Sequence, residues 1–215
     1  MLSLTPGGLW PWVVLAGLGC FHGVNPAMGW LFSVALGLHR HSRKIVALSW
    51  IPIALGHAAA VALVLFAVLA LGLVLNHAVL SRAAAALLLG WALWHAIRGH
   101  RQRLRVGMQT GLTGLAFWSF LMSSAHGAGL MLVPVLLGMP AGPDAPDIPG
   151  ITTNTLVQDV AAVTVHSVSM LLVMGVIALI VYERLGLNVL RKAWLNVDLI
   201  WSVAVIAAGV VMLFT

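Results

Sequence analysis

Four histidines lie near the centres of long apolar stretches of this chain: His22, His57, His126 and His166. Each falls within about one helical turn of the middle of its stretch, and no Lys, Arg, Asp or Glu lies near those centres. If the stretches cross a membrane, an ionisable group at that depth is costly and marks a functional site by default. Imidazole suits Zn, Cu, Ni and Fe, so the four histidines predict a transition-metal site at one depth.

Helical spacing gives these histidines further neighbours. Met122 lies four residues before His126 and Met170 four residues after His166, so each pair shares a helix face. Thioether sulfur favours soft Cu(I), while the missing carboxylates at these depths argue against Mg, Ca and Mn. The alternatives stay open: a buried histidine can be a hydrogen-bonded core residue, and a methionine can serve packing alone.

Four other polar or sulfur-bearing residues are candidates for the walls of a cavity. Asn25, three residues beyond His22, and Met28 follow the first histidine, and Ser123 is a hydrogen-bonding candidate in the fourth stretch. Asp159 lies two turns before His166 on the same face, where it could draw in a cation or a proton. It could equally be a carboxylate favoured by the helix dipole.

Proline and glycine flank two of the histidines and predict interrupted helices. Gly23 and Pro26 surround Asn25, and the carbonyl four residues before Pro26 belongs to His22. We expect that carbonyl and the Asn25 amide to face a cavity, as in the broken helices of transporters. Gly127, Gly129 and Pro134 are the equivalents in the fourth stretch. Close packing of small residues is the alternative interpretation.

The elements that carry these residues are membrane helices. Of the 215 residues 61% are hydrophobic and 7% charged, and the mean hydropathy is +1.06, which excludes a soluble enzyme, a disulfide scaffold, a disordered chain and a nucleic-acid binder. A membrane crossing needs about 20 apolar residues, and six stretches are near or above that length. They are Leu9–Leu38, Ile45–Leu75, Leu80–Ile97, Gly111–Met139, Leu156–Val181 and Val197–Phe214.

Basic residues predict the orientation. Ten of the eleven Lys and Arg follow the first, third and fifth stretches, and only Arg82 falls on the other side. Because basic residues accumulate in cytoplasmic loops, both termini are expected outside the cytoplasm of a multi-pass inner or plasma membrane protein. The first 39 residues lack Lys and Arg, so no cleaved secretory signal is expected.

The two halves of the chain resemble each other. The first and fourth stretches share a His-Gly pair followed by a methionine, and the second and fifth each have one central histidine. Three crossings per half place the second copy upside down, which is the inverted-repeat plan of secondary transporters. We therefore expect an all-α protein with six transmembrane helices, of which the first and the fourth are broken. In this arrangement, residues 1–110 form the first three-helix repeat and contain a cytoplasmic basic loop, and residues 111–215 form the second repeat.

The chain resembles the lysine exporter (LysE) superfamily through His22-Gly-Val-Asn-Pro-Ala-Met and Leu55-Gly56-His57-Ala58. In motif it is most similar to the nickel/cobalt exporter branch, although Ala27 stands where that branch has Asp and the His-rich cytoplasmic loop is missing. Asn25-Pro26 is instead similar to the amino-acid exporter branch. The resemblance implies a six-helix exporter but leaves nickel/cobalt specificity open.

These observations predict a proton-coupled secondary transporter or exporter of a transition-metal cation, with Ni, Co, Zn and Cu unresolved. Alternatives are an exporter of an amino acid or other small metabolite, and a membrane assembly factor that delivers metal without net transport. No enzyme activity, organic cofactor or nucleic-acid partner is expected. The expected partners are the lipid bilayer, protons and the cargo, and a homo-oligomer is compatible with them.

Overall fold

The computed structural model describes residues 8–72, 77–98, 111–137, 139 and 156–185, with single positions at 203, 206 and 210. All the regular elements in those ranges are helical, as the apolar composition predicts. The sixth predicted crossing, Val197–Phe214, lies outside the described residues apart from the three single positions.

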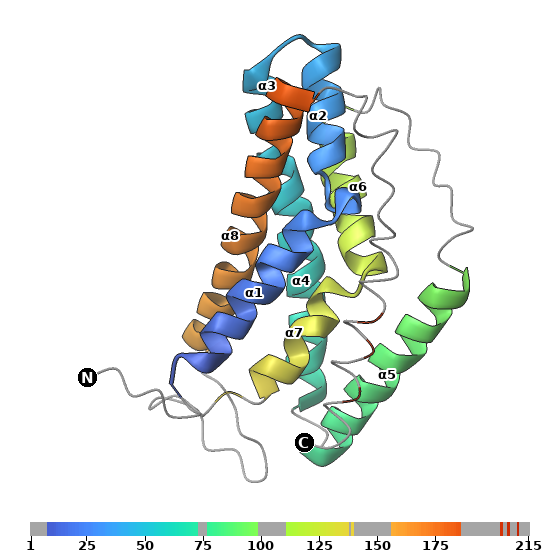
Figure 1. The fold of residues 1–215 in the computed structure, drawn as a ribbon. Helices are drawn as coiled ribbons and strands as arrows, with labels where there is room; N and C mark the ends of the chain where they lie inside the picture. Colours follow the sequence, from blue (N-terminus) through green and yellow to red (C-terminus); the bar gives the residue numbers. More distant parts are fainter. Residues whose placement is uncertain are drawn as a thin grey trace.

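The helices pack side by side as a bundle (Figure 1). The elements are α1 (Trp10–Val24), the 3-10 turn η1 (Pro26–Met28), α2 (Trp30–His39), α3 (Arg43–Leu48), α4 (Trp50–Gly72), α5 (His77–Arg98), α6 (Leu112–Ala125), α7 (Ala128–Leu137), α8 (Leu156–Ile180) and the π-helical turn η3 (Val181–Leu185).

Two helical segments of the described chain are long and apolar enough to cross a membrane alone, Arg43–Val68 and Val157–Arg184. The bent pair of α6 and α7 makes a third if it forms one span. The first predicted crossing consists of two shorter apolar helices, α1 and α2. Their lengths of roughly 22 and 15 Å fall short of a hydrocarbon core of about 30 Å, so neither would cross alone.

The first break falls where the sequence predicts it, around Pro26. The helix ends at Val24, Asn25 adopts an extended conformation, and Gly29 takes φ 124°, a left-handed value that favours glycine. At this break the Asn25 N–H donates to the His22 carbonyl at 3.2 Å and closes the last turn of α1. The expected cavity beside these two groups stays a prediction.

The second break lies at His126 and Gly127, where the axes of α6 and α7 bend by 53°. Gly127 has φ 67°, and its N–H donates to Ser124 O at 3.1 Å. Pro134 was predicted to contribute to this break, but it lies inside α7, which continues through it. The left-handed glycine after His126 therefore turns the chain, and the proline only removes one N–H donor from a later turn.

The bundle is built from two close helix pairs. The first pair is α1 with α8, and the second is α4 with α6; these make the most extensive contacts among the described elements (Figure 1). In addition, α7 packs on α4 and α2 packs on α8, while α5 lies against α7 at the edge of the bundle. Many side chains on the outer faces are apolar and exposed, among them Leu55, Phe66 and Leu172, as a bilayer-facing surface requires.

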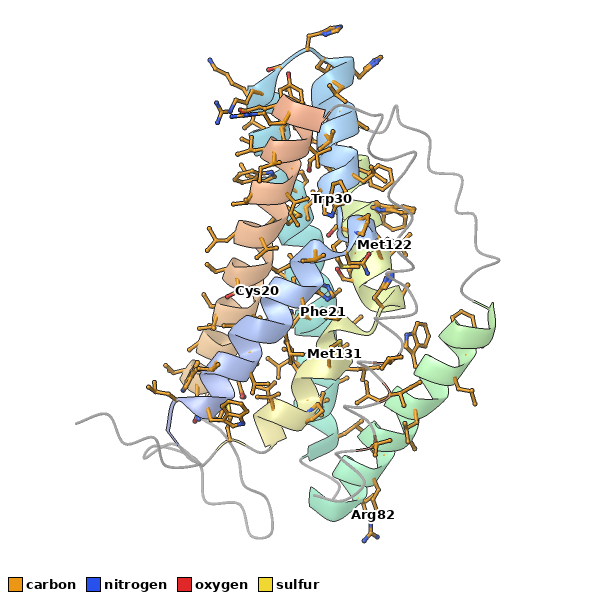
Figure 2. All side chains as sticks on the ribbon, viewed as in Figure 1. Cys20, Phe21, Trp30, Arg82, Met122 and Met131 are labelled. Carbon is orange, nitrogen blue, oxygen red and sulfur yellow. The ribbon has the colours of Figure 1, made fainter. Side chains whose placement is uncertain are left out.

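The α2–α3 turn forms one end of the bundle. Arg40, Arg43 and Lys44 are exposed there, and Arg43 Nε lies 3.0 Å from Glu183 Oε1 of η3. Arg82 lies at the opposite end, near the start of α5 (Figure 2). Arg82 and the basic residues of the α2–α3 turn thus lie at opposite ends of the bundle, as the sequence predicts for them.

Candidate functional site

Three of the four predicted histidines meet in the interior of the bundle. The ring centroid of His22 on α1 lies 5.2 Å from that of His57 on α4 and 5.6 Å from that of His166 on α8. The His57 and His166 rings are 5.7 Å apart and stacked at 19°. All three side chains are at most 1% exposed. We call these residues the histidine triad.

Glycines in α1 explain how the triad forms. A Cβ atom at Gly19 would collide with the backbone oxygen of His166, and one at Gly23 with the backbone oxygen of Met170. The backbones of α1 and α8 therefore touch, as small residues allow in membrane helices. His22 lies three residues after Gly19 on the same face of α1, so this contact brings its ring against His166.

The second helix pair places His57 in the same way. A Cβ atom at the neighbouring Gly56 would collide with the Ala116 backbone oxygen of α6. Two buried serines of α6 face α4 at this contact: Ser119 Oγ donates to Ile53 O at 2.8 Å, and Ser123 Oγ lies 3.1 Å from His57 Nδ1. The His57 Nε2 atom is buried with no hydrogen-bond partner among the described residues.

His126 lies at the break between α6 and α7 and is 2% exposed. Its Nδ1 is 2.9 Å from the Met122 carbonyl oxygen; since a carbonyl only accepts, Nδ1–H is the donor and the neutral ring has its lone pair on Nε2. The fourth predicted ligand is therefore buried at the break between α6 and α7, and its ring is fixed by its own helix.

The triad has the spacing of metal ligands but not their orientation. On one tetrahedral ion with metal–nitrogen bonds of about 2.0–2.1 Å, three imidazole centroids would lie roughly 5 Å apart, close to the spacing here. In the described ranges, however, no group of three His, Cys, Asp or Glu side chains is arranged to hold a metal ion. Rotation about χ2, which is a broad torsion in histidine, would change the direction of the nitrogens without moving the helices.

The other predicted cavity residues differ in burial and in their hydrogen bonds. Asn25 is 1% exposed; its Oδ1 accepts from the Ala27 N–H at 3.0 Å, and its Nδ2 has no hydrogen-bond partner among the described residues. Met28 and Met170 are buried, and Met122 is half-buried on α6, as its label marks in Figure 2. No methionine sulfur is placed as a ligand by these observations.

Asp159 lies in the first turn of α8 and is 4% exposed. It shares the buried face of that helix with Ala162 and His166, about 10 Å from His166 along the axis. This position is compatible with both predicted roles of Asp159. The carboxylate is close to the helix N-terminus, where the helix dipole favours it, and it lies on the same helix face as His166, where it could draw in a cation or a proton.

Two glycines that were predicted to contribute to the helix breaks allow close packing. Gly23 is the next-to-last residue of α1 and packs against α8, so it lies beside the predicted break at Asn25. Gly129 lies inside α7, where a Cβ atom would come within 2.6 Å of Val64 on α4, so the prediction that Gly129 interrupts a helix is wrong.

Tryptophans at both breaks have a role that the sequence did not indicate. The Trp30 indole N–H donates to Val24 O at 3.0 Å, and the Trp91 indole N–H of α5 donates to Ala125 O at 2.9 Å. Each indole thus satisfies a carbonyl released at a helix end. In the sequence, Trp91 lies towards the end of a predicted crossing, a position that predicts an anchor at the membrane interface. Only the fold brings its indole to the break.

No protein-family model, curated protein or solved structure matches this chain. The resemblance to the LysE superfamily therefore stays a prediction carried by the motifs around His22 and His57.

Proposed function

We propose that this protein moves a transition-metal cation across a membrane, with the histidine triad as its binding site. The observation that carries the proposal is the mutual ring contact of three buried histidines from α1, α4 and α8. These side chains come from distant parts of the sequence. The helices bury them at positions where an aliphatic side chain would cost less free energy to bury. Neutral imidazole is a good ligand for Zn, Cu, Ni and Co.

Protons are the proposed coupling ion. A protonated imidazole has no lone pair for a metal, so proton binding and metal binding exclude each other at the same nitrogen. Protonation from one side of the membrane would release the cargo, and metal binding from the other side would expel the protons. His126 and Asn25 are the proposed additional contacts, since both are buried at the helix breaks near the triad.

The proposed architecture is a three-plus-three inverted repeat of six crossings. Its support is the pairing of the helices: exchanging α1 with α6 and α8 with α4 converts the first close pair into the second. The same exchange converts the packing of α2 on α8 into that of α7 on α4. Both broken segments, α1–α2 and α6–α7, have a histidine at or just before the break. Such repeats surround a site at the midplane in secondary transporters.

Purified protein in sealed proteoliposomes tests the proposal. A zinc-sensitive dye inside the vesicles reports uptake of Zn²⁺, and the same experiment is repeated with Co²⁺ and Ni²⁺. The variant His22→Ala/His57→Ala/His166→Ala should lose uptake of the transported ion. His41→Ala is the matched control, because His41 is exposed in the α2–α3 turn and should leave uptake unchanged.

The outcomes separate the proposal from its alternatives. Metal binding without flux indicates a metal-delivery factor, and flux of a labelled amino acid without metal binding indicates a metabolite exporter. Metal uptake that survives replacement of all three triad histidines contradicts the proposed site.

A further inference from the structure

We propose that Ser123 is a positioning residue that fixes the tautomer of His57, so that the ring presents the lone pair of Nε2 inside the bundle. The tautomer itself does not depend on the proposed function. Its consequence for metal affinity rests on that function.

The contact between Ser123 and His57 is well isolated from water. Ser123 Oγ lies 3.1 Å from His57 Nδ1, and both residues are 1% exposed. The opposite ring nitrogen, Nε2, is buried and has no hydrogen-bond partner among the described residues. Within the described ranges, Nδ1 is therefore the one ring nitrogen whose protein partner can bias the position of the proton.

Two arrangements of the proton are conceivable, and they differ in what they leave at Nε2. If the Ser123 hydroxyl donates to Nδ1, the ring proton sits on Nε2 as a buried N–H with no acceptor. If Nδ1–H donates to Ser123 Oγ, Nε2 carries a lone pair instead. Buried donors without acceptors are rarer in proteins than under-satisfied acceptors, which favours the second arrangement. A lone pair at Nε2 is also what a metal ion requires.

His126 supports the same conclusion from the neighbouring residue. The Met122 carbonyl can only accept, so His126 has its proton on Nδ1 and its lone pair on Nε2. Met122 and Ser123 are consecutive residues in the last full turn of α6. That one turn thus holds two histidines in the same tautomer, His126 through a backbone oxygen and His57 through a hydroxyl. Hydrogen bonds of this kind commonly orient metal-binding histidines.

Ser119 provides an unusually close control. It lies one turn before Ser123 on α6, it is 2% exposed, and it also faces α4. Its hydroxyl donates to a backbone oxygen, that of Ile53, rather than to a ring. Removing either hydroxyl costs one hydrogen bond between the same two helices, but only the loss of Ser123 acts on a histidine.

The first experiment measures the tautomer in the metal-free protein. Histidine labelled with ¹⁵N is incorporated, and the His57 signals are assigned by comparison with His57→Ala. We expect protonated Nδ1 and unprotonated Nε2 in the wild type and in Ser119→Ala, and a mixture of tautomers in Ser123→Ala. A wild-type His57 protonated at Nε2 would overturn the proposal, whether or not the protein binds metal.

The second experiment measures Zn²⁺ affinity by titration of the whole protein in detergent. We expect Ser123→Ala to weaken binding about 10- to 100-fold, the range for losing a partner that orients a ligand. Ser123→Thr retains the hydroxyl and should restore affinity to within about threefold of the wild type, and Ser119→Ala should stay in that range. Equal losses in Ser119→Ala and Ser123→Ala would reduce the role of Ser123 to helix packing and contradict the proposal. A wild type that binds no Zn²⁺, Co²⁺ or Ni²⁺ would instead contradict the proposed function and leave the tautomer result standing.

Discussion

The His57 side chain places a polar nitrogen in the apolar interior, and the described residues do not satisfy it. Nε2 is buried and has no hydrogen-bond partner in the part of the chain that the structure describes, while Nδ1 contacts Ser123. An unsatisfied buried polar atom costs about 1–3 kcal/mol of folding free energy. A residue that weakens the fold in this way is expected where function, rather than packing, selects it.

Replacing His57 by Leu should therefore separate stability from binding. We expect His57→Leu to change the free energy of unfolding of the metal-free protein by no more than about 1–3 kcal/mol, because it removes the unsatisfied Nε2 but also leaves the buried Ser123 hydroxyl without its ring partner. A metal at 100 times its dissociation constant should stabilise the wild type by about 2.7 kcal/mol and the variant by almost nothing. Thermal unfolding in detergent, with and without Zn²⁺, measures both effects. An equal metal-induced shift in the variant would rule out His57 as a ligand.

Metal affinity should fall as the pH is lowered. The sign follows from competition: an imidazole must be neutral to bind metal, so protons and metal exclude each other on each histidine nitrogen. Titrations at about pH 8 and about pH 5.5 bracket the ordinary imidazole pKa of about 6.5, and affinity should be lower in the acidic buffer. Calorimetry in two buffers of different ionisation enthalpy counts the protons released. Affinity that is independent of pH between these two buffers would contradict the proposed coupling of metal binding to protons in this range.

The residue types of the proposed ligands were predictable from the sequence, but the grouping of their rings was not. The sequence shows that each of these histidines lies in the middle of an apolar stretch, and it therefore predicts that His22, His57 and His166 lie at one depth. Which rings touch depends on how closely the helices approach, and that is decided by Gly19, Gly23 and Gly56, residues common in membrane helices for many reasons.

At the scale of the elements, the contact between α1 and α8 depends on glycines that face a neighbouring backbone. Gly19 faces the His166 backbone, whereas Gly17, half a turn earlier on α1, is exposed and has nothing within 4 Å of an added Cβ atom. Gly17 and Gly19 therefore lie on the same helix but in different surroundings, so that one can serve as a control for the other.

Gly19→Ala should push α1 away from α8, and Gly17→Ala should not. Overpacking of a tight contact costs about 1–3 kcal/mol, so we expect a clear loss of thermal stability and of metal affinity for Gly19→Ala. For Gly17→Ala, alanine has the higher helix propensity by about 1 kcal/mol, and stability should be unchanged or improved. Thermal unfolding and Zn²⁺ titration of both variants check this, and similar behaviour of the two would show that the contact does not position the triad.

The helix breaks show what local sequence can and cannot predict. Pro26 removes a backbone donor, and the chain breaks beside it as expected. Pro134 has the same chemistry but lies inside α7, because Gly127 had already turned the chain seven residues earlier. A proline therefore indicates a possible discontinuity, while the surrounding contacts decide whether the helix bends there. The indoles that satisfy the carbonyls at the breaks depend on those contacts as well.

For the whole molecule, composition predicts the helical class correctly, since the described elements are helices with apolar outer faces. The number of crossings and the inverted repeat stay predictions, because the sixth apolar stretch lies almost entirely outside the described residues. Orientation likewise follows from charge statistics rather than from packing, and so needs a measurement across a real membrane.

Labelling of single cysteines from each side tests that orientation. In a Cys20→Ser background, Ser42→Cys lies in the basic α2–α3 turn, and Arg82→Cys lies near the start of α5, at the opposite end of the bundle. We expect a membrane-impermeant thiol reagent added to intact cells to label Arg82→Cys and not Ser42→Cys, with the reverse pattern in inverted vesicles. Removal of Arg82 can only reinforce this orientation, because it deletes a basic residue from the outer side. Labelling of both positions from one side would contradict the topology.

The division of the bundle into two close helix pairs also divides the buried histidines. His22 and His166 belong to α1 and α8, whereas His57 and His126 belong to α4 and to the end of α6. If the pairs rock against each other as units, the coordination number available to an ion changes from four to two, while the distances inside each pair stay the same. Such a motion would lower the affinity for the ion by removing half of its ligands at once, without unfolding either half of the site.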